Sequence, residues 1–279
     1  MLIPYAVDVP MARLPWANWA LIAFTIAISV SVWLGAWDAP DVEEPLRFPD
    51  NMGNKENFDQ IVAKIRTSIR MLDEPPAGSL QPRQFHFSQL VTHIFVHLNV
   101  LHLLGNMFFL FAFANAVNAK LGHLPFLGTY LLAGFAAGSA WLLIGEHRPA
   151  LGASGAIMGI VGVFFIFFPR NDVLFWGNFA YRDFGTFYVP AYYVISFYLV
   201  ADLLGVIWQH ESGIGYVAHL GGALTGITLA IVLVTSRVVR SAFGEENLLQ
   251  TLGVQKRRPS RDELDWQERR RRRRRSSLT

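Results

Sequence analysis

The feature that most constrains this chain is a series of long apolar runs. About 18–20 consecutive apolar residues are needed for a helix to cross a bilayer, and 52% of the 279 residues are hydrophobic. We place six runs at Trp16–Trp37, Ile94–Ala119, Leu124–Gly145, Gly152–Pro169, Val189–Trp208 and Val217–Ser236. The fourth is short and rich in glycine, so we expect its helix to start inside the membrane. The pattern predicts an all-α protein with six transmembrane helices.

The ends of the chain predict its orientation. Residues 1–15 lack the basic flank of a secretory signal, so the first apolar run should remain as a span. Residues 238–279 form a basic tail ending in the run Arg269–Arg275. The positive-inside rule then puts this tail, and with an even number of spans the N-terminus, in the cytosol. We favour a membrane-surface role for the arginines over a nucleic-acid patch, and the small size and absence of a transit peptide indicate a bacterial inner membrane.

The loop at 38–90 is long, polar and more acidic than basic. Within it, apolar residues recur at helical spacing from Phe58 to Leu72, with Asn57 as a plausible N-cap and two prolines, Pro75 and Pro76, at the end. We expect an amphipathic helix here. Its apolar side can lie in the membrane interface or pack on its own loop.

Polar residues inside membrane spans are costly unless they face a bundle interior or water, so each is a functional candidate. The second span places His93, His97, His102 and Asn106 near one helical face. A histidine pair one turn apart can also bind a metal. A catalytic zinc site needs a third ligand and a general base, and no Glu lies between His93 and His97, so we expect no metal.

The fourth run begins LGASGAIMG, which places Ser154 between glycines at 152 and 155. A serine with so little side-chain cover can simply belong to a helix-packing face. Alternatively it can be a nucleophile: the glycines allow a tight turn and open approach, and the helix start supplies free N–H groups.

The last run contains GYVAHLGGALTG. Gly222 and Gly226 form a small-xxx-small pattern that lets two membrane helices touch backbone to backbone. His219 lies one turn before Gly222. We expect the partner helix to be the glycine-faced start of the fourth span, which would bring His219 within reach of Ser154.

Together, His-x-x-x-His-x-x-x-x-His-x-x-x-Asn at 93–106, Gly-Ala-Ser-Gly at 152–155 and Ala-His-x-x-Gly-x-x-x-Gly at 218–226 resemble the rhomboid family of intramembrane serine proteases. The resemblance covers roughly residues 15–237. It implies a rhomboid-like bundle in which Ser154 is the nucleophile and His219 the general base. The oxyanion hole would be formed by His102, Asn106 and the Ser154 backbone N–H. Gly152, Gly155, His97, Gly222 and Gly226 would support the site, with His97 in a network leading to water.

Two positions bear on the catalytic histidine. Asp202, near the outer end of the fifth span, resembles an acidic position in relatives, and we interpret it as structural or loop-anchoring, which leaves a dyad without an acidic third member. Relatives often carry a tyrosine one turn after the nucleophile, where this chain has Met158, so the stacking role is in doubt. Because losing the acid in soluble triads costs on the order of 10⁴ in turnover, a dyad predicts slow chemistry.

The resulting hypothesis is a serine endopeptidase that needs no cofactor and cleaves single-pass transmembrane proteins near the extracytoplasmic face. The expected partners are these substrates and membrane lipid, not nucleic acid. One alternative is a catalytically silent rhomboid-like protein that binds membrane clients. A second is a transporter that uses the histidines as a proton path, which would not require the glycine setting of Ser154. An aspartyl protease would need a second intramembrane Asp, and none is visible.

Overall fold

The computed structural model describes residues 2–11, 13–35, 75–146, 148–177, 185–208, 214–241 and 245–256. The amphipathic helix predicted at 57–72 and the run Arg269–Arg275 lie outside the described residues.

Within the described residues, five helical segments are long and apolar enough to cross a membrane. These are α1 (Trp16–Trp33), the continuous segment Val100–Leu121, α6 (His123–Ile144), α8 (Ala191–Trp208) and α9 (Tyr216–Thr235). Short helical pieces lie at η1 (Pro82–Gln84), α3 (Gln89–Thr92), η2 (His93–Phe95) and α10 (Leu248–Thr251). The predicted helical membrane bundle is therefore present.

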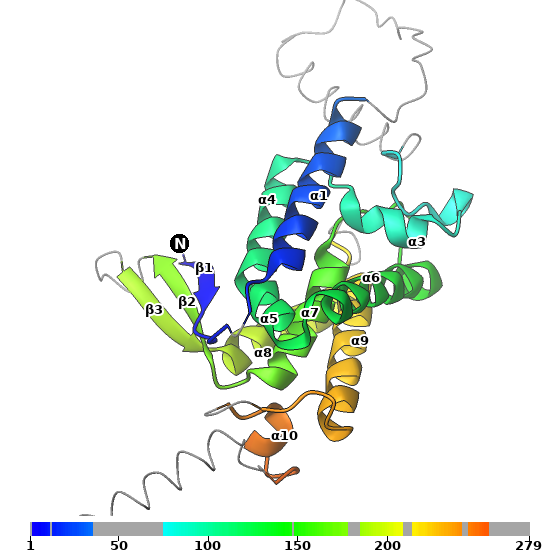
Figure 1. Ribbon diagram of the computed structural model, residues 1–279. Coiled ribbons are helices and arrows are strands. Elements are labelled where there is room, and N and C mark those ends of the chain that lie inside the picture. The colour runs from blue at the N-terminus through cyan, green and yellow to red at the C-terminus, as the bar shows by residue number, and fades with distance from the viewer. Residues whose placement is uncertain are drawn as a thin grey trace, which may run out of the picture.

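The sixth apolar helix, α7 (Ser154–Phe167), has only 14 residues. At 1.5 Å per residue it is about 21 Å long, shorter than the roughly 30 Å of a bilayer core. It lies among the other helices (Figure 1), and nearly every one of its side chains is buried. A helix that is apolar on all sides is stable only when surrounded by protein, so α7 forms the centre of the bundle.

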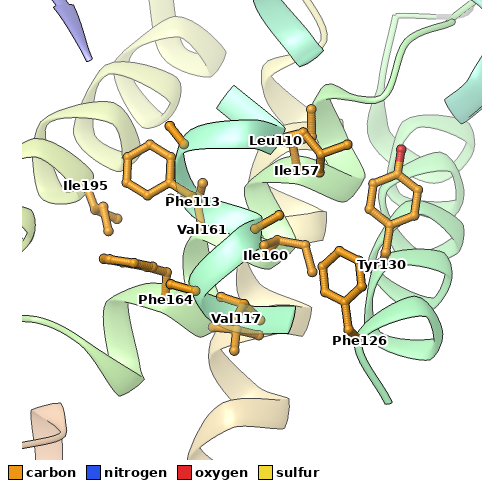
Figure 2. Close-up of a cluster of buried hydrophobic side chains, with 14 of the residues drawn as sticks. Leu110, Phe113, Val117, Phe126, Tyr130, Ile157, Ile160, Val161, Phe164 and Ile195 are labelled. Carbon is orange, nitrogen blue, oxygen red and sulfur yellow. The ribbon is translucent and has the colours of Figure 1, made fainter. Parts of the chain in front are cut away.

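Side chains of the second span and α6 cover α7 with large apolar groups. Figure 2 shows Ile160 between the second span and Phe126 of α6, and Phe164 beneath Phe113. The Phe113 and Phe164 rings meet edge to face with centroids 5.3 Å apart. By contrast, Leu101 and Leu143 on the outer helices are each 80–81% exposed, as expected of surfaces that face lipid.

α9 meets α7 backbone to backbone. A Cβ on Gly222 would lie 1.9 Å from the Gly155 carbonyl oxygen, and one on Gly226 would lie 1.8 Å from that of Gly159. Any side chain at 222 or 226 would force the helices apart. The small-xxx-small pattern therefore sets the contact between the fourth and sixth apolar helices.

The second span differs from the single helix that we predicted over 94–119. His93 lies in η2 and His97 in an irregular stretch, so only His102 and Asn106 belong to α4 (Val100–Phe109). The span continues through a π-helical turn, η3 (Leu110–Ala114), into α5 (Asn115–Leu121). The prediction of one polar stripe along a single helix was wrong, because Asn99 caps a new helix after His97.

A three-stranded antiparallel sheet, which we did not predict, flanks the bundle (Figure 1). It contains β1 (Leu2–Val7), β2 (Asp172–Gly177) and β3 (Gly185–Pro190) in that order. The fifth span consequently begins at Ala191, two residues later than expected. Val173 of β2 is fully buried in the main core, which joins the sheet to the bundle.

The helices define two membrane faces. The start of α1 and the ends of α5 and α9 lie toward α10, and we call this side the tail face (Figure 1). The end of α1 and the starts of α7 and α9 lie on the opposite side, which we call the loop face.

Candidate functional site

A tight turn places Ser154 at the first residue of α7, toward the loop face. Gly152 has φ +120°, a conformation that side chains other than glycine rarely adopt. Its N–H donates to the His93 carbonyl oxygen at 2.9 Å. A Cβ on Gly152 would lie 2.6 Å from Cε1 of His102. Glycine at 152 is therefore needed both for the turn and to leave space for the imidazole beside it.

His97 is hydrogen bonded to the backbone of this turn. The Ala153 N–H donates to Nε2 of His97 at 3.3 Å. That bond requires the His97 proton on Nδ1, which donates to the Ser29 hydroxyl at 3.0 Å, and Ser29 in turn donates to the Phe95 carbonyl oxygen at 2.9 Å. His97 is fully buried and both ring nitrogens contact protein groups. His97 therefore positions the turn, and its expected place in a network leading to water stays a prediction.

The structure brings Ser154 and His219 together across the α7–α9 contact. The Ser154 Oγ lies 2.8 Å from Nε2 of His219. Both residues are only partly buried. The distance is within hydrogen-bond range for a hydroxyl and the base that takes its proton.

Asp202 of α8 completes a line of three groups. Its Oδ1 lies 3.1 Å from Nδ1 of His219, and the two side chains are 12% and 16% exposed. A carboxylate accepts, so the Nδ1 proton donates to Asp202 and Nε2 is left free to accept from Ser154. The expectation that His219 has no acidic neighbour is therefore wrong, because α8 packs against α9 and places Asp202 within hydrogen-bond distance of the imidazole.

Two donors converge on the turn opposite His219. His102 and Asn106 lie one turn apart on α4, which begins where the Asn99 side chain accepts from the His102 N–H at 2.9 Å. The Asn106 Nδ2 is buried without a hydrogen-bond partner. A Cβ on Gly152 would lie 2.9 Å from His102 Nε2 and 3.7 Å from Asn106 Nδ2, so both nitrogens point at the nucleophile's turn.

Other aromatic and imidazole groups support the surroundings. The Tyr216 ring lies edge-on to His219 with centroids 6.4 Å apart, and it packs against Gly205 of α8, where a Cβ would lie 2.6 Å from the ring. His93 is packed against Gly138 of α6. Its Nδ1 donates to the Gln89 carbonyl oxygen at 2.7 Å. These contacts place His93 in the packing of η2 against α6.

Met158 is buried in α7 one turn after Ser154. No ring is available there to stack on the imidazole, and the aromatic neighbour of His219 is instead Tyr216, one turn earlier on its own helix. Among the described residues, no three His, Asp or Glu side chains gather closely enough to hold a metal ion.

Sequence reasoning missed the hydrogen bond of Asp202 to His219 and that of Ser29 to His97. The signal for Asp202 was present, since a carboxylate in the apolar run YLVADLLG is a functional candidate by default. Ser29 had no comparable signal, because single serines are common in membrane helices and only the packing of α1 against the His97 segment assigns it a partner.

Comparison with known proteins identifies a shared domain. A family model described as Rhomboid domain matches residues 84–236, more than half of the chain. The presenilin-associated rhomboid-like protein of Homo sapiens mitochondria is 30% identical over 168 residues, covering 58% of this chain and 41% of that protein.

Two plant proteins are similar over a comparable stretch. Chloroplastic Rhomboid-like protein 11 of Arabidopsis thaliana is 30% identical over 153 residues, which is 52% of each chain. Mitochondrial RHOMBOID-like protein 6 of the same plant is 26% identical over 145 residues, covering 52% of this chain and 43% of that protein.

The chain spans about half the length of the curated relatives it matches. These relatives are named as organellar proteins, so they do not support the expectation of a bacterial membrane. The matched region begins before the His93 segment and ends after α9, and it contains the site residues described above except Ser29 of α1. The chain belongs to the rhomboid family.

Proposed function

We propose that this protein is a serine endopeptidase that cleaves single-pass transmembrane proteins within the membrane, near the loop face. The observation that carries the proposal is the line of three groups from Ser154 through His219 to Asp202, at 2.8 and 3.1 Å. Each atom in that line has the donor or acceptor character that nucleophilic attack requires.

In the first half of the reaction, the Ser154 Oγ attacks the scissile carbonyl carbon and passes its proton to Nε2 of His219. The imidazolium then donates this proton to the leaving amine, and the C–N bond breaks to give an acyl-enzyme. Asp202 holds the Nδ1 proton and stabilises the imidazolium without taking the proton itself. Turnover need not be limited by a missing acid, as we expected for a dyad.

The negative charge on the carbonyl oxygen requires donors placed in advance. Asn106 Nδ2 has no partner in the resting site, and His102 lies next to it. The first backbone N–H groups of α7, including that of Ser154, have no acceptor within their own helix and carry the positive end of its dipole. These groups together form the proposed oxyanion hole.

In the second half, His219 takes a proton from water, the hydroxide attacks the acyl carbon, and the proton returns to Ser154 Oγ as the ester bond breaks. The substrate must also expose its backbone, because a spanning helix keeps its carbonyl groups in hydrogen bonds. We therefore expect preferred substrates to carry helix-weakening glycine, proline or polar residues near the loop face.

Cleavage of a single-pass reporter in proteoliposomes tests this function. The wild type should release both fragments, whereas Ser154→Ala and His219→Ala should lose cleavage by more than about 10³-fold. Ser139→Ala is the matched control, because its hydroxyl only bonds the Phe135 carbonyl of its own helix at 2.8 Å. Equal cleavage by Ser154→Ala and wild type would refute the proposal, and a folded wild type that binds reporters without cutting them would favour a client-binding protein.

A further inference from the structure

A basic cavity lies at the tail face, across the bundle from the catalytic groups. It has a volume of about 390 Å³ and is formed where the entry to α1, the α5–α6 turn and the exit from α9 meet. Three cationic side chains line it, one from each segment: Arg13, Lys120 and Arg240. The protease site described above uses none of them.

Two of these three cations have no acidic partner among the described residues. Lys120 is already paired with Glu245 and lies over the Phe168 ring, 5.8 Å from its centroid. No described carboxylate forms an ion pair with Arg13 or Arg240. Counting only the residues that the structure describes, the cavity therefore has two guanidinium groups without a carboxylate partner, and such groups are suited to a planar, bidentate contact with phosphate oxygens.

The position of Arg13 depends on a glycine. Gly122 turns the chain between α5 and α6 with φ +86°, and a Cβ there would lie 2.9 Å from Nη1 of Arg13. The guanidinium thus lies directly over this turn. A side chain at 122 would be strained and would displace it.

The remaining wall is formed by apolar side chains. Pro125, Leu233 and Val238 line the cavity, and Val238 is 73% exposed. Leu124, beside Pro125, is 80% exposed. A free inorganic anion would gain nothing from these surfaces, whereas acyl chains would cover them.

Exposed aromatic residues near the cavity indicate that it lies at the depth of the lipid headgroups. Trp16 and Trp19 begin α1 three and six residues after Arg13, are 59% and 36% exposed, and meet edge to face at 4.9 Å. The side chains of Tyr192 and Tyr193, at the start of α8, are also exposed. Exposed tryptophan and tyrosine rings gather where a membrane meets water.

We propose that this cavity binds the phosphate of an anionic phospholipid from the tail-face leaflet, with Arg13 and Arg240 on the phosphate and the acyl chains over the apolar wall. Basic pockets between membrane helices are suited to such headgroups. The arginine run at 269–275 has the wrong charge to occupy the site. The acidic stretch at 262–265 is the competing occupant within this chain.

The test measures thermal unfolding and lipid retention of the full chain in neutral detergent. Micelles contain phosphatidylcholine alone, phosphatidylcholine with phosphatidylglycerol, or phosphatidylcholine with free phosphate at matched ionic strength. A ligand that binds the folded state raises Tm, and native mass spectrometry counts bound lipid. The variants are Arg13→Gln and Arg240→Gln. Arg237→Gln removes a charge from the same face outside the cavity and is the matched control.

Phosphatidylglycerol should raise the Tm of wild type and Arg237→Gln, whereas phosphatidylcholine and free phosphate should not. The half-maximal lipid concentration should increase about fivefold for each cavity arginine removed. If free phosphate raised the Tm as much as phosphatidylglycerol does, the ligand would be a small anion and not a lipid, which would overturn the proposal. It would also fail if all three variants responded alike. Lipid binding only by a full chain in which Asp262, Glu263 and Asp265 are replaced by Asn, Gln and Asn would also overturn it, because the acidic stretch would then be the occupant.

Discussion

Two polar clusters lie along the second span, one on each side of the π-helical turn at 110–114, and both include residues of neighbouring helices. They differ in which polar atom has no hydrogen-bond partner. The loop-face cluster contains the proposed catalytic groups, together with His102 and Asn106 of α4. The tail-face cluster joins α1 to α5 through Asn18, Asn115, Asn118 and His123. Asn18 and Asn118 are fully buried, whereas Ser154 and His219 are only partly buried, and in both clusters polar groups lie within an apolar bundle and need hydrogen-bond partners.

In the tail-face cluster, the side-chain nitrogens of Asn18 and Asn118 both have hydrogen-bond partners. Asn18 Nδ2 donates to Asn115 Oδ1 at 2.8 Å and to the Leu110 carbonyl oxygen at 3.2 Å. The Asn18 backbone N–H donates to Asn118 Oδ1 at 3.2 Å, and Asn118 Nδ2 lies 3.2 Å from Nδ1 of His123. Leu110 opens the π-turn, so this cluster holds the irregular point of the span.

The difference lies in the atom that each cluster leaves without a partner. In the tail-face cluster it is an acceptor, Asn18 Oδ1, whereas near Ser154 it is a donor, Asn106 Nδ2. An oxyanion needs donors, so only the second vacancy is useful for catalysis. We therefore propose that one cluster stabilises the bundle and that the other keeps a donor available for substrate.

The largest expected effect in this comparison is that of Asp202→Asn. An amide at 202 can donate to Nδ1 of His219, which moves the imidazole proton to Nε2 and prevents it from accepting the Ser154 proton. We expect kcat to decrease by about 10²–10⁴-fold with the fold retained, as in soluble triads. Reporter cleavage with circular dichroism measures this, and unchanged kcat would restore the dyad interpretation.

The next prediction compares kcat for two asparagine variants, one on each side of the π-turn. Asn106→Ala removes one proposed oxyanion donor and should decrease kcat by about 10²–10³-fold with little change in stability. Asn115→Ala is the matched control from the same span and should leave the kcat of folded protein nearly unchanged. If both variants lost kcat equally, the distinction between the clusters would not hold.

Asn18→Ala should affect stability and not chemistry. It removes two side-chain hydrogen bonds between α1 and the second span, and we expect it to lower the free energy of unfolding by about 0.5–2 kcal/mol. Thr25→Val is the control, because the Thr25 hydroxyl bonds only the Leu21 carbonyl of its own helix. Unfolding in mixed micelles measures the difference; a loss of kcat without loss of stability would contradict the assignment.

The smallest effect concerns a carboxylate outside the membrane-spanning helices. Partial burial and the charge of Asp8 raise the pKa of Asp172. The folded state therefore favours the neutral carboxyl of Asp172. Its contribution to the free energy of unfolding is fully present below the pKa that Asp172 has in the unfolded chain, and it is lost as pH rises through the higher pKa of the folded protein. Asp172→Asn should remove this pH-dependent decrease, which changes the free energy of unfolding by no more than about 0.5 kcal/mol. Unfolding at pH 4 and pH 7 checks it, and an effect on cleavage is not expected.

Much of the bundle could be predicted because its signals are local. Apolar run length located the spans, and Gly222 and Gly226 indicated the close contact that brings His219 to Ser154. The break at Asn99 and the π-turn were missed because a polar residue in an apolar run does not show whether the helix continues. β1 could not be found because its pairing with β2 joins residues about 170 positions apart. The basic cavity likewise depends on three distant segments.

The most direct test of the central claim is mapping a covalent adduct after treatment of the solubilised protein with a fluorophosphonate, which reacts with an activated serine hydroxyl. We predict one adduct on Ser154 by peptide mass spectrometry, retained in Ser139→Ala, lost in Ser154→Ala and formed much more slowly in His219→Ala and Asp202→Asn. Labelling of Ser154→Ala to the same extent as wild type, or labelling at the same rate without His219, would contradict the account.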